Sequence, residues 1–230
     1  SESSGAVPDM SANDLVKTLQ KYSVKIDKMA GDSCDLMINK KLYSIGDEDC
    51  RQDGAFTTYI AKAKKPYISM MMDHSRDFIV LTHEFGHFVE YNVGGSQNNL
   101  LVDEDNTDLS EIASNGFEGL MTNYYGDIFG KKVAEEATRN TVEDLIENIT
   151  EGCIYDEFQR EVYADPDMTL DEINKTFSKI NAEYDNSLEG DPGYSWVYVN
   201  HNFEGPMYYI SYAVSGLAAL QIWDISQKDF

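Results

Sequence analysis

The residues with the clearest capacity for chemistry are two histidines four positions apart, with a glutamate beside the first. The chain reads His83-Glu84-Phe85-Gly86-His87. On a helix, positions i and i+4 lie on one face, so both imidazole rings can reach one metal ion. The carboxylate of Glu84 can then reach a water held by that metal, take its proton and pass it to a leaving amine. The spacing predicts a zinc peptidase site; the alternative is a pair of ordinary surface histidines.

A catalytic zinc usually has three protein ligands and one open position. Glu111 is the best candidate for the third ligand, because it lies in a second helical segment after a polar loop that can turn the chain back. Glu118 follows two turns later on the same face, where a carboxylate can orient a ligand histidine. Each acid also has a simpler explanation, Glu111 as a helix N-terminal residue and Glu118 as a solvated acid. We predict one zinc ion per chain, held by His83, His87 and Glu111.

These residues must be positioned by a chain that is predicted to be mainly α with a small β-sheet. Residues 1–14 are small and polar and are expected to form a flexible tail, and residues 15–230 one catalytic domain. Helical periodicity marks 15–30. Glycines then separate short apolar runs, so 31–72 is the predicted sheet region, with strands at 34–38, 55–60 and 67–72.

The last of these strands begins just after Pro66, which suits a sheet edge. It either completes a small sheet or offers an exposed edge that pairs with the backbone of a peptide substrate.

Residues 73–230 are predicted to be helical, beginning with the helix that carries the zinc motif. Asp73 or Ser75 should cap this helix, and Gly94-Gly95 should end it.

The next predicted helix carries Glu111. Thr107 or Asp108 should cap it, the latter with capping-box spacing to Glu111, and Gly126 should end it. The remaining predicted helices are one or two within 131–164, one over 169–185 that starts at Thr169, and a last one from Pro206 to Trp223.

Net charge argues against two classes of partner. The 230 residues include 18 Lys and Arg against 41 Asp and Glu, a net charge of −23, which disfavours nucleic acid and anionic membrane surfaces. No apolar run approaches the ~20 residues of a membrane span. The charge would weakly attract cationic peptides or metal ions, although a solvated acidic surface is the simpler interpretation.

The cysteines Cys34, Cys50 and Cys153 are sparse, odd in number and not in CxxC spacing. This favours reduced thiols and a cytoplasmic location, with a disulfide between Cys34 and Cys50 left open.

The zinc motif and the segments around it resemble a known family. Residues 83–87, with the run Glu111-Ile-Ala-Ser114 and Glu118, resemble the thimet oligopeptidase and oligoendopeptidase F family of zinc metallopeptidases. Gly-Ala-Phe at 54–56 and Pro-Tyr-Ile at 66–68 are similar to sheet segments ahead of that family's metal helix. His-Asn-Phe-Glu-Gly-Pro-Met-Tyr-Tyr-Ile-Ser-Tyr at 201–212 and Leu-Gln-Ile-Trp at 220–223 are similar to its substrate-binding loop and following helix, most closely in the oligoendopeptidase F branch.

This resemblance, over about residues 50–223, implies a zincin-like catalytic domain, part of a helical, clam-shaped fold around a deep channel. Members are much longer, so it also predicts a catalytic-domain fragment or a shortened homologue. It implies an endopeptidase that cuts internal bonds of oligopeptides, with Glu84 as general base and His201 stabilising the transition state.

Three tyrosines follow His201 on the last predicted helix. Tyr208 and Tyr212 are four residues apart and Tyr209 and Tyr212 three, so either pair can point into a cleft. A phenol there could stabilise the oxyanion of peptide hydrolysis. We favour Tyr212 as catalytic with His201, and Tyr208 and Tyr209 as substrate-binding residues, against the alternative that the rings are core packing.

Two other functions remain open at this stage. The shortness of the chain favours a peptide-binding module without catalysis, although the intact motif argues against it. A zinc carboxypeptidase of similar fold is the other candidate. The oligomeric state is not predicted.

Overall fold

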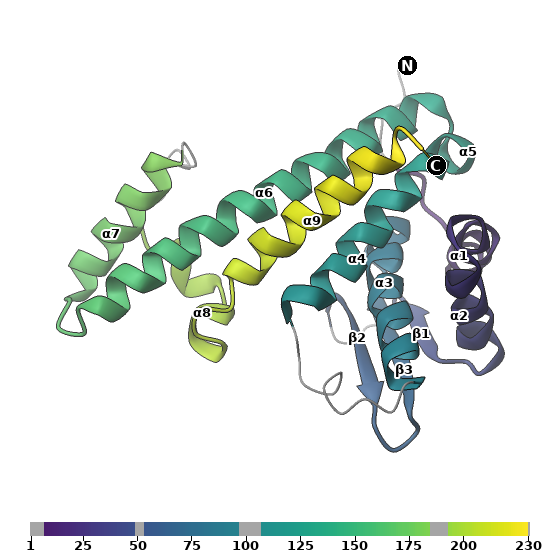
Figure 1. The fold of residues 1–230 in the computed structure, drawn as a ribbon, viewed down its shortest axis with the longest axis horizontal. Coiled ribbons are helices and arrows are strands. Elements are labelled where there is room, and N and C mark those ends of the chain that lie inside the picture. The colour runs from purple at the N-terminus through teal and green to yellow at the C-terminus, as the bar shows by residue number, and fades with distance from the viewer. Residues whose placement is uncertain (1–6, 49–52, 97–106, 185–192, 230) are drawn as a thin grey trace.

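Two consecutive helices open the described part of the chain, which comprises residues 7–48, 53–96, 107–184 and 193–229 in this computed structural model (Figure 1). Helix α1 (Ala12–Ile26) buries Leu15, Leu19 and Tyr22 along one face, as its periodicity predicts. It begins within the predicted tail. Helix α2 (Lys28–Asn39) contradicts the strand predicted at 34–38. The side chain of Asp27 accepts a hydrogen bond from the N–H of Met29 and so starts this second helix.

The sheet has three strands in the order β1-β3-β2, formed by β1 (Tyr43–Gly46), β2 (Ala55–Ile60) and β3 (Lys65–Met71). β2 and β3 confirm two predicted strands, and β1 was not predicted. β3 is the central strand, parallel to β1 and antiparallel to β2, so the prediction of an edge strand at 67–72 was wrong.

Pro66 is compatible with a central strand because of where the pairing starts. It lies opposite Tyr59 of β2, whereas β1 pairs with β3 only from Ile68 onward. The missing N–H of Pro66 therefore interrupts no hydrogen bond to β1. Since both edges of β3 are paired, this strand offers no free edge for a peptide.

Helix α3 (Asp77–Ser96) packs against β2, β3 and helix α4 (Thr107–Met121). It starts later than predicted, because the carboxylate of Asp73 accepts hydrogen bonds from Ser75 outside the helix. It also continues through the two glycines that were predicted to end it. A Cβ on Gly95 would lie 2.6 Å from the phenol oxygen of Tyr59, so this glycine allows contact between α3 and β2.

Beyond α4 most of the described residues are helical, and the long helices α6 (Lys131–Ala164) and α9 (Ile210–Ser226) lie side by side (Figure 1). The side chains of Thr107 and Asp108, the predicted caps of α4, lie outside the described residues. The prediction that this helix ends at Gly126 was wrong: α4 ends earlier, at Met121, and Gly126 lies inside a separate short helix that ends at Gly130, which has a positive φ of 82°. The elements are the 3₁₀ segment Thr122–Tyr124, α5 (Tyr125–Phe129), α6 (Lys131–Ala164), α7 (Leu170–Glu183), the 3₁₀ segment Ser195–Tyr198, α8 (His201–Glu204) and α9 (Ile210–Ser226).

Two of these helices test predicted boundaries directly. Thr169 caps α7 in a full capping box with Glu172, which confirms the predicted start of that helix. α9 begins at Ile210 rather than at Pro206, because Met207 takes a positive φ of 62° that interrupts a helix.

The chain is therefore mainly α with a small sheet, as predicted. The larger core lies among the sheet and α1 to α5, and a smaller aromatic core joins α6 to α7. Within the described residues, none of the helices is long and apolar enough to cross a membrane. Cys34 and Cys153 are free thiols, and Cys50 lies outside the described residues.

Candidate metal site

The zinc motif lies in the middle of α3, and apolar packing holds this helix in place. His83 and His87 emerge on one face, with their ring centroids 5.1 Å apart. Both predicted ligands are thus presented one helical turn apart. The side chains that anchor the helix are almost fully buried: Phe78, Leu81, Phe85 and Phe88.

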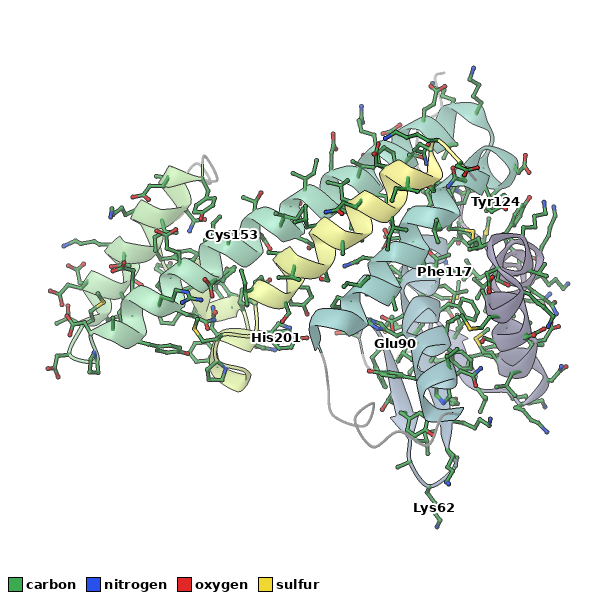
Figure 2. The ribbon with its side chains drawn as sticks, in the orientation of Figure 1. Lys62, Glu90, Phe117, Tyr124, Cys153 and His201 are labelled. Atoms are coloured by element: carbon green, nitrogen blue, oxygen red, sulfur yellow. The ribbon has the colours of Figure 1, made fainter. Side chains whose placement is uncertain are left out.

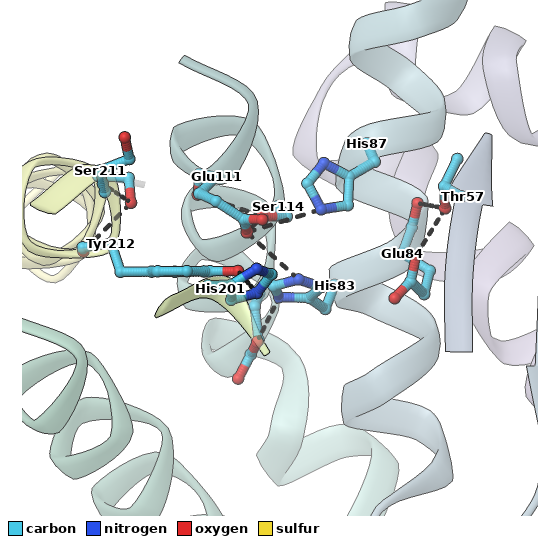
Figure 3. Close-up of polar contacts among 11 residues, drawn as sticks. Thr57, His83, Glu84, His87, Glu111, Ser114, His201, Ser211 and Tyr212 are labelled. Carbon is cyan, nitrogen blue, oxygen red and sulfur yellow. Dashed lines mark hydrogen bonds and ion pairs between the residues drawn. The ribbon is translucent and has the colours of Figure 1, made fainter. Parts of the chain in front are cut away.

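Glu111 of α4 faces both histidines (Figure 3). Its Oε2 lies 3.5 Å from His83 Nε2 and 3.6 Å from His87 Nε2. Two ligand atoms that are each about 2.1 Å from a tetrahedral zinc lie about 3.4 Å apart, so these separations fit that ion. The ligand atoms of all three residues lie within 4.8 Å of one another. The hydroxyl of Ser114 donates a 2.9 Å hydrogen bond to Oε2 and orients the carboxylate.

Glu118 lies on the far side of His83. Its Oε2 is 3.4 Å from His83 Nδ1, so a proton on Nδ1 faces Glu118 and Nε2 is left for a metal. Burial lowers the pKa of His83, but the hydrogen bond and charge of Glu118, with Glu111 and Glu84, outweigh it and raise the pKa to about 9. Burial lowers the pKa of His87.

Glu84 is buried between α3 and the sheet. Its Oε2 accepts a 2.7 Å hydrogen bond from the hydroxyl of Thr57 on β2, which also bonds the backbone carbonyl of Glu84 at 2.8 Å. Burial raises the pKa of this carboxyl. Thr57 thus fixes the glutamate that the sequence assigns as general base. The sequence analysis missed Thr57, because only the folded sheet brings it to residue 84.

Gly86 explains how α3 and α4 approach each other so closely. A Cβ at this position would lie 2.5 Å from both the carbonyl oxygen of Ala113 and the Cα of Ser114. Such contacts are impossible without moving the backbone of α4. The glycine inside the motif therefore sets the separation of the two helices that carry the candidate ligands.

We expect Gly86→Ala to destabilise the fold by ~1–3 kcal/mol, because its methyl group overpacks the crossing with α4, and to weaken zinc binding by displacing Glu111. Urea denaturation and zinc content per chain would measure both effects. Gly126→Ala is the matched control. It also replaces a helical glycine, but its Cβ would meet nothing within 4 Å, so it should stabilise slightly through helix propensity. Unchanged zinc affinity in Gly86→Ala would contradict this role.

A second group of residues could in principle hold a metal: Asp9, His74 and Asp77. Here His74 Nδ1 and Asp9 Oδ1 are 2.9 Å apart, a hydrogen-bond distance shorter than two ligands of one zinc would adopt. Both side chains are also largely exposed. The geometry of this group is that of an ion pair.

His201, on α8, lies near the first turns of α4 (Figure 2). Ring contacts join it to all three tyrosines in one aromatic cluster, and Figure 3 shows its contact with Tyr212. The hydroxyl of Tyr212 lies 3.3 Å from His201 Nε2. The ring of Tyr208 lies 4.8 Å from that of His201, centroid to centroid. Burial, then Tyr208 and the charge of Glu111, raise the pKa of Tyr212. The side chain of Tyr212 extends toward Glu111 and His83 (Figure 3).

Tyr209 connects this cluster to the smaller core. Its ring centroid is 4.5 Å from that of Tyr155, in the smaller core. Burial and the neighbouring Glu151 raise its pKa to about 12. Of the three tyrosines, Tyr209 therefore has the strongest packing role.

Comparison with solved structures addresses the fold. Over 97% of its length, this chain matches a protein assigned as an oligoendopeptidase F at 25% identity, with a TM-score of 0.86. The chain has the oligoendopeptidase F fold. PZ peptidase A, solved with an inhibitor, gives a TM-score of 0.80 at 23% identity. A Bacillus anthracis protein assigned as oligoendopeptidase F gives 0.78 at 21%. A helical, zincin-like fold, predicted from the resemblance, is thereby confirmed.

The chain spans 41%, 41% and 38% of the lengths of these three proteins. No protein-family model and no curated protein matched the sequence. The oligoendopeptidase F fold therefore rests on structure, and the activity of this chain is a separate question.

Proposed function

We propose that this chain is the zinc-dependent catalytic part of a peptidase that hydrolyses internal bonds of oligopeptides. The observation that carries the proposal is the convergence of His83, His87 and Glu111 on one point, with the buried carboxyl of Glu84 close enough to interact electrostatically with His83 and Glu111. The peptidases that share the fold support the reaction class.

His83, His87 and Glu111 would hold the ion, since two imidazoles and a carboxylate form a donor set typical of catalytic zinc. When bound, zinc would acidify water and polarise the peptide carbonyl. Glu84 acts as the general base: it takes a proton from the attacking water and delivers it to the leaving amine. Its raised pKa brings the carboxyl closer to neutral pH, where a base of this kind is most effective.

Tyr212 and His201 act as hydrogen-bond donors to the carbonyl oxygen as it gains negative charge. A phenol with an ordinary pKa already keeps its proton at neutral pH, and the raised pKa of Tyr212 reinforces this, so its hydroxyl can donate a hydrogen bond. Tyr208 packs against His201 and would contact the substrate backbone or side chains.

We expect Tyr212→Phe to lower kcat about 10- to 100-fold with little change in KM. The loss should be smaller than the 10²–10³-fold of a sole oxyanion donor, because the metal shares the charge. Tyr209→Phe is the comparison, since that ring packs against Tyr155. A larger loss of kcat in Tyr209→Phe than in Tyr212→Phe would contradict the assignment.

The reaction itself is tested with a quenched oligopeptide that is blocked at both ends, with and without a chelator. We expect cleavage that the chelator abolishes and added zinc restores. Binding without cleavage would show a silent peptide-binding module. Cleavage only of peptides with a free C-terminus would show a carboxypeptidase. The cytoplasmic location stays a prediction from the cysteines.

A further inference from the structure

A cavity of about 510 Å³ opens directly behind the candidate metal site. It lies between the first half of α3, the middle of α4 and the central part of α6. His83 and Glu118 form the wall that it shares with the metal site, and Glu147 and Glu151 of α6 line another part. The volume is within the range of small-ligand pockets, about 300–1,000 Å³.

The acids of this cavity differ in whether they are already neutralised. Asp144 forms a 2.5 Å ion pair with Arg76, and Glu118 faces His83. In the described part of the chain Glu147 and Glu151 form no ion pair with a cationic side chain, although Glu151 shares a hydrogen bond with the phenol of Tyr209. They stand one turn apart on α6, where two like charges repel each other. This repulsion contributes, after burial, to a raised pKa of Glu151. A cation placed between the two carboxylates would relieve it.

One buried hydroxyl of the same cavity also lacks a partner among the described residues. Thr141 is only 1% exposed, yet its hydroxyl has no hydrogen-bond partner among the described residues. The hydroxyl of Thr141 lies close enough to that of the buried Tyr125 to lower the pKa of this phenol, but the contact between the two does not have the geometry of a hydrogen bond. Asn115, 4% exposed, lines the cavity as well. A buried hydroxyl without a partner is costly unless a ligand or water supplies the hydrogen bond.

The cavity is connected to the residues proposed to act on the substrate. Glu151 interacts with Tyr209, whose ring lies 5.1 Å from that of Tyr212. The opposite wall is His83 itself. A peptide that passes between His83 and the tyrosines can therefore place one side chain or its amino end in this cavity.

We propose that the cavity is a subsite for a positively charged group of a peptide substrate, an ammonium or guanidinium held by Glu147 and Glu151. The inference rests on the proposed peptidase function and adds a substrate preference to it. Thr141 stands six residues before Glu147 on α6, about 9 Å along the helix, so a water in the cavity, and not the cation itself, would supply the partner of its hydroxyl.

The test measures binding of blocked peptides to Glu84→Gln, which should not turn them over. Lys, norleucine or Glu is placed in turn at each position of one peptide. At one position we expect Lys to bind about tenfold more tightly than norleucine, as for hydrogen bonds to a charged group. A norleucine peptide with a free amino end distinguishes an N-terminal ammonium from a side chain.

Glu147→Gln/Glu151→Gln, added to Glu84→Gln, should bring the ratio of Lys to norleucine affinity close to one. Glu135→Gln/Glu136→Gln removes two charges from the first turns of α6 and should leave the ratio unchanged. The ratio within one variant does not depend on how much of the protein is folded. A ratio near one at every position, or one that survives Glu147→Gln/Glu151→Gln, would overturn the subsite.

Failure of the subsite is distinguishable from failure of the proposed function. If zinc-loaded wild-type protein cleaves peptides but shows no preference for a cation, the result supports the proposed peptidase function and contradicts the subsite. If peptides with Lys bind preferentially but zinc-loaded wild-type protein does not cleave them, the result supports the subsite and contradicts the proposed catalysis.

Discussion

Glu84→Gln is expected to lower kcat about 10²- to 10⁴-fold while the zinc content stays at one ion per chain. The glutamine has nearly the same shape, so it can still accept the hydrogen bond from Thr57 that holds residue 84 in place. It has no basic carboxylate, so it accepts no proton from the attacking water. Steady-state kinetics on a quenched peptide and metal analysis of the same preparation measure the two quantities.

Two variants make this result specific. Thr57→Val removes the hydrogen bond but keeps the base, so it should lower kcat less than Glu84→Gln does. Glu135→Gln removes an exposed acid from α6 and should have no effect. Turnover of Glu84→Gln close to that of wild type, at full zinc occupancy, would rule out Glu84 as the general base.

The candidate ligands could be predicted from the sequence because their geometry is local. The four-residue spacing of His83 and His87 determines their separation on any helix. Glu111 could be chosen because it lies on a second predicted helix after a polar loop, and Glu118 because it follows seven residues later on the same face. The structure brings both carboxylates to His83. Their roles as ligand and orienting residue remain proposals until metal is measured.

The supporting contacts could not be predicted in this way, because they depend on packing between distant segments. Thr57 reaches Glu84 across 27 residues, and the sequence shows it only as one position in a strand. Gly86 looks like a variable position of the motif until the folded chain shows the backbone of Ala113 2.5 Å from where a Cβ would lie. Such contacts have no periodic signal.

The errors in the fold have the same origin. The apolar run 34–38 suits a strand by composition, but α2 buries Cys34 and Met37 on one helical face against α1. Pro66 suggests a sheet edge, yet its position at the start of β3 lets a central strand accept it. Local preference was overruled in both places by the neighbours of the segment.

His87→Ala is expected to weaken zinc binding about 10³-fold or more. Loss of a residue that only orients a ligand typically costs 10- to 100-fold, and removal of a ligand itself must cost more. Glu118→Gln provides the comparison within this site, because Glu118 faces Nδ1 of His83 while His87 Nε2 faces Glu111. Zinc affinity measured by competition with a chromophoric chelator gives both values on one scale.

The order of these two losses tests the arrangement itself. If His83, His87 and Glu111 hold the ion, His87→Ala must lose far more affinity than Glu118→Gln. Equal losses would place Glu118 among the ligands, and a larger loss in Glu118→Gln would exclude the proposed set. His74→Ala should retain full affinity, since His74 and Asp9 are spaced as an ion pair and not as co-ligands. The zinc affinities of these three variants thus distinguish a ligand, a residue that orients a ligand and a residue outside the site, without any measurement of catalysis.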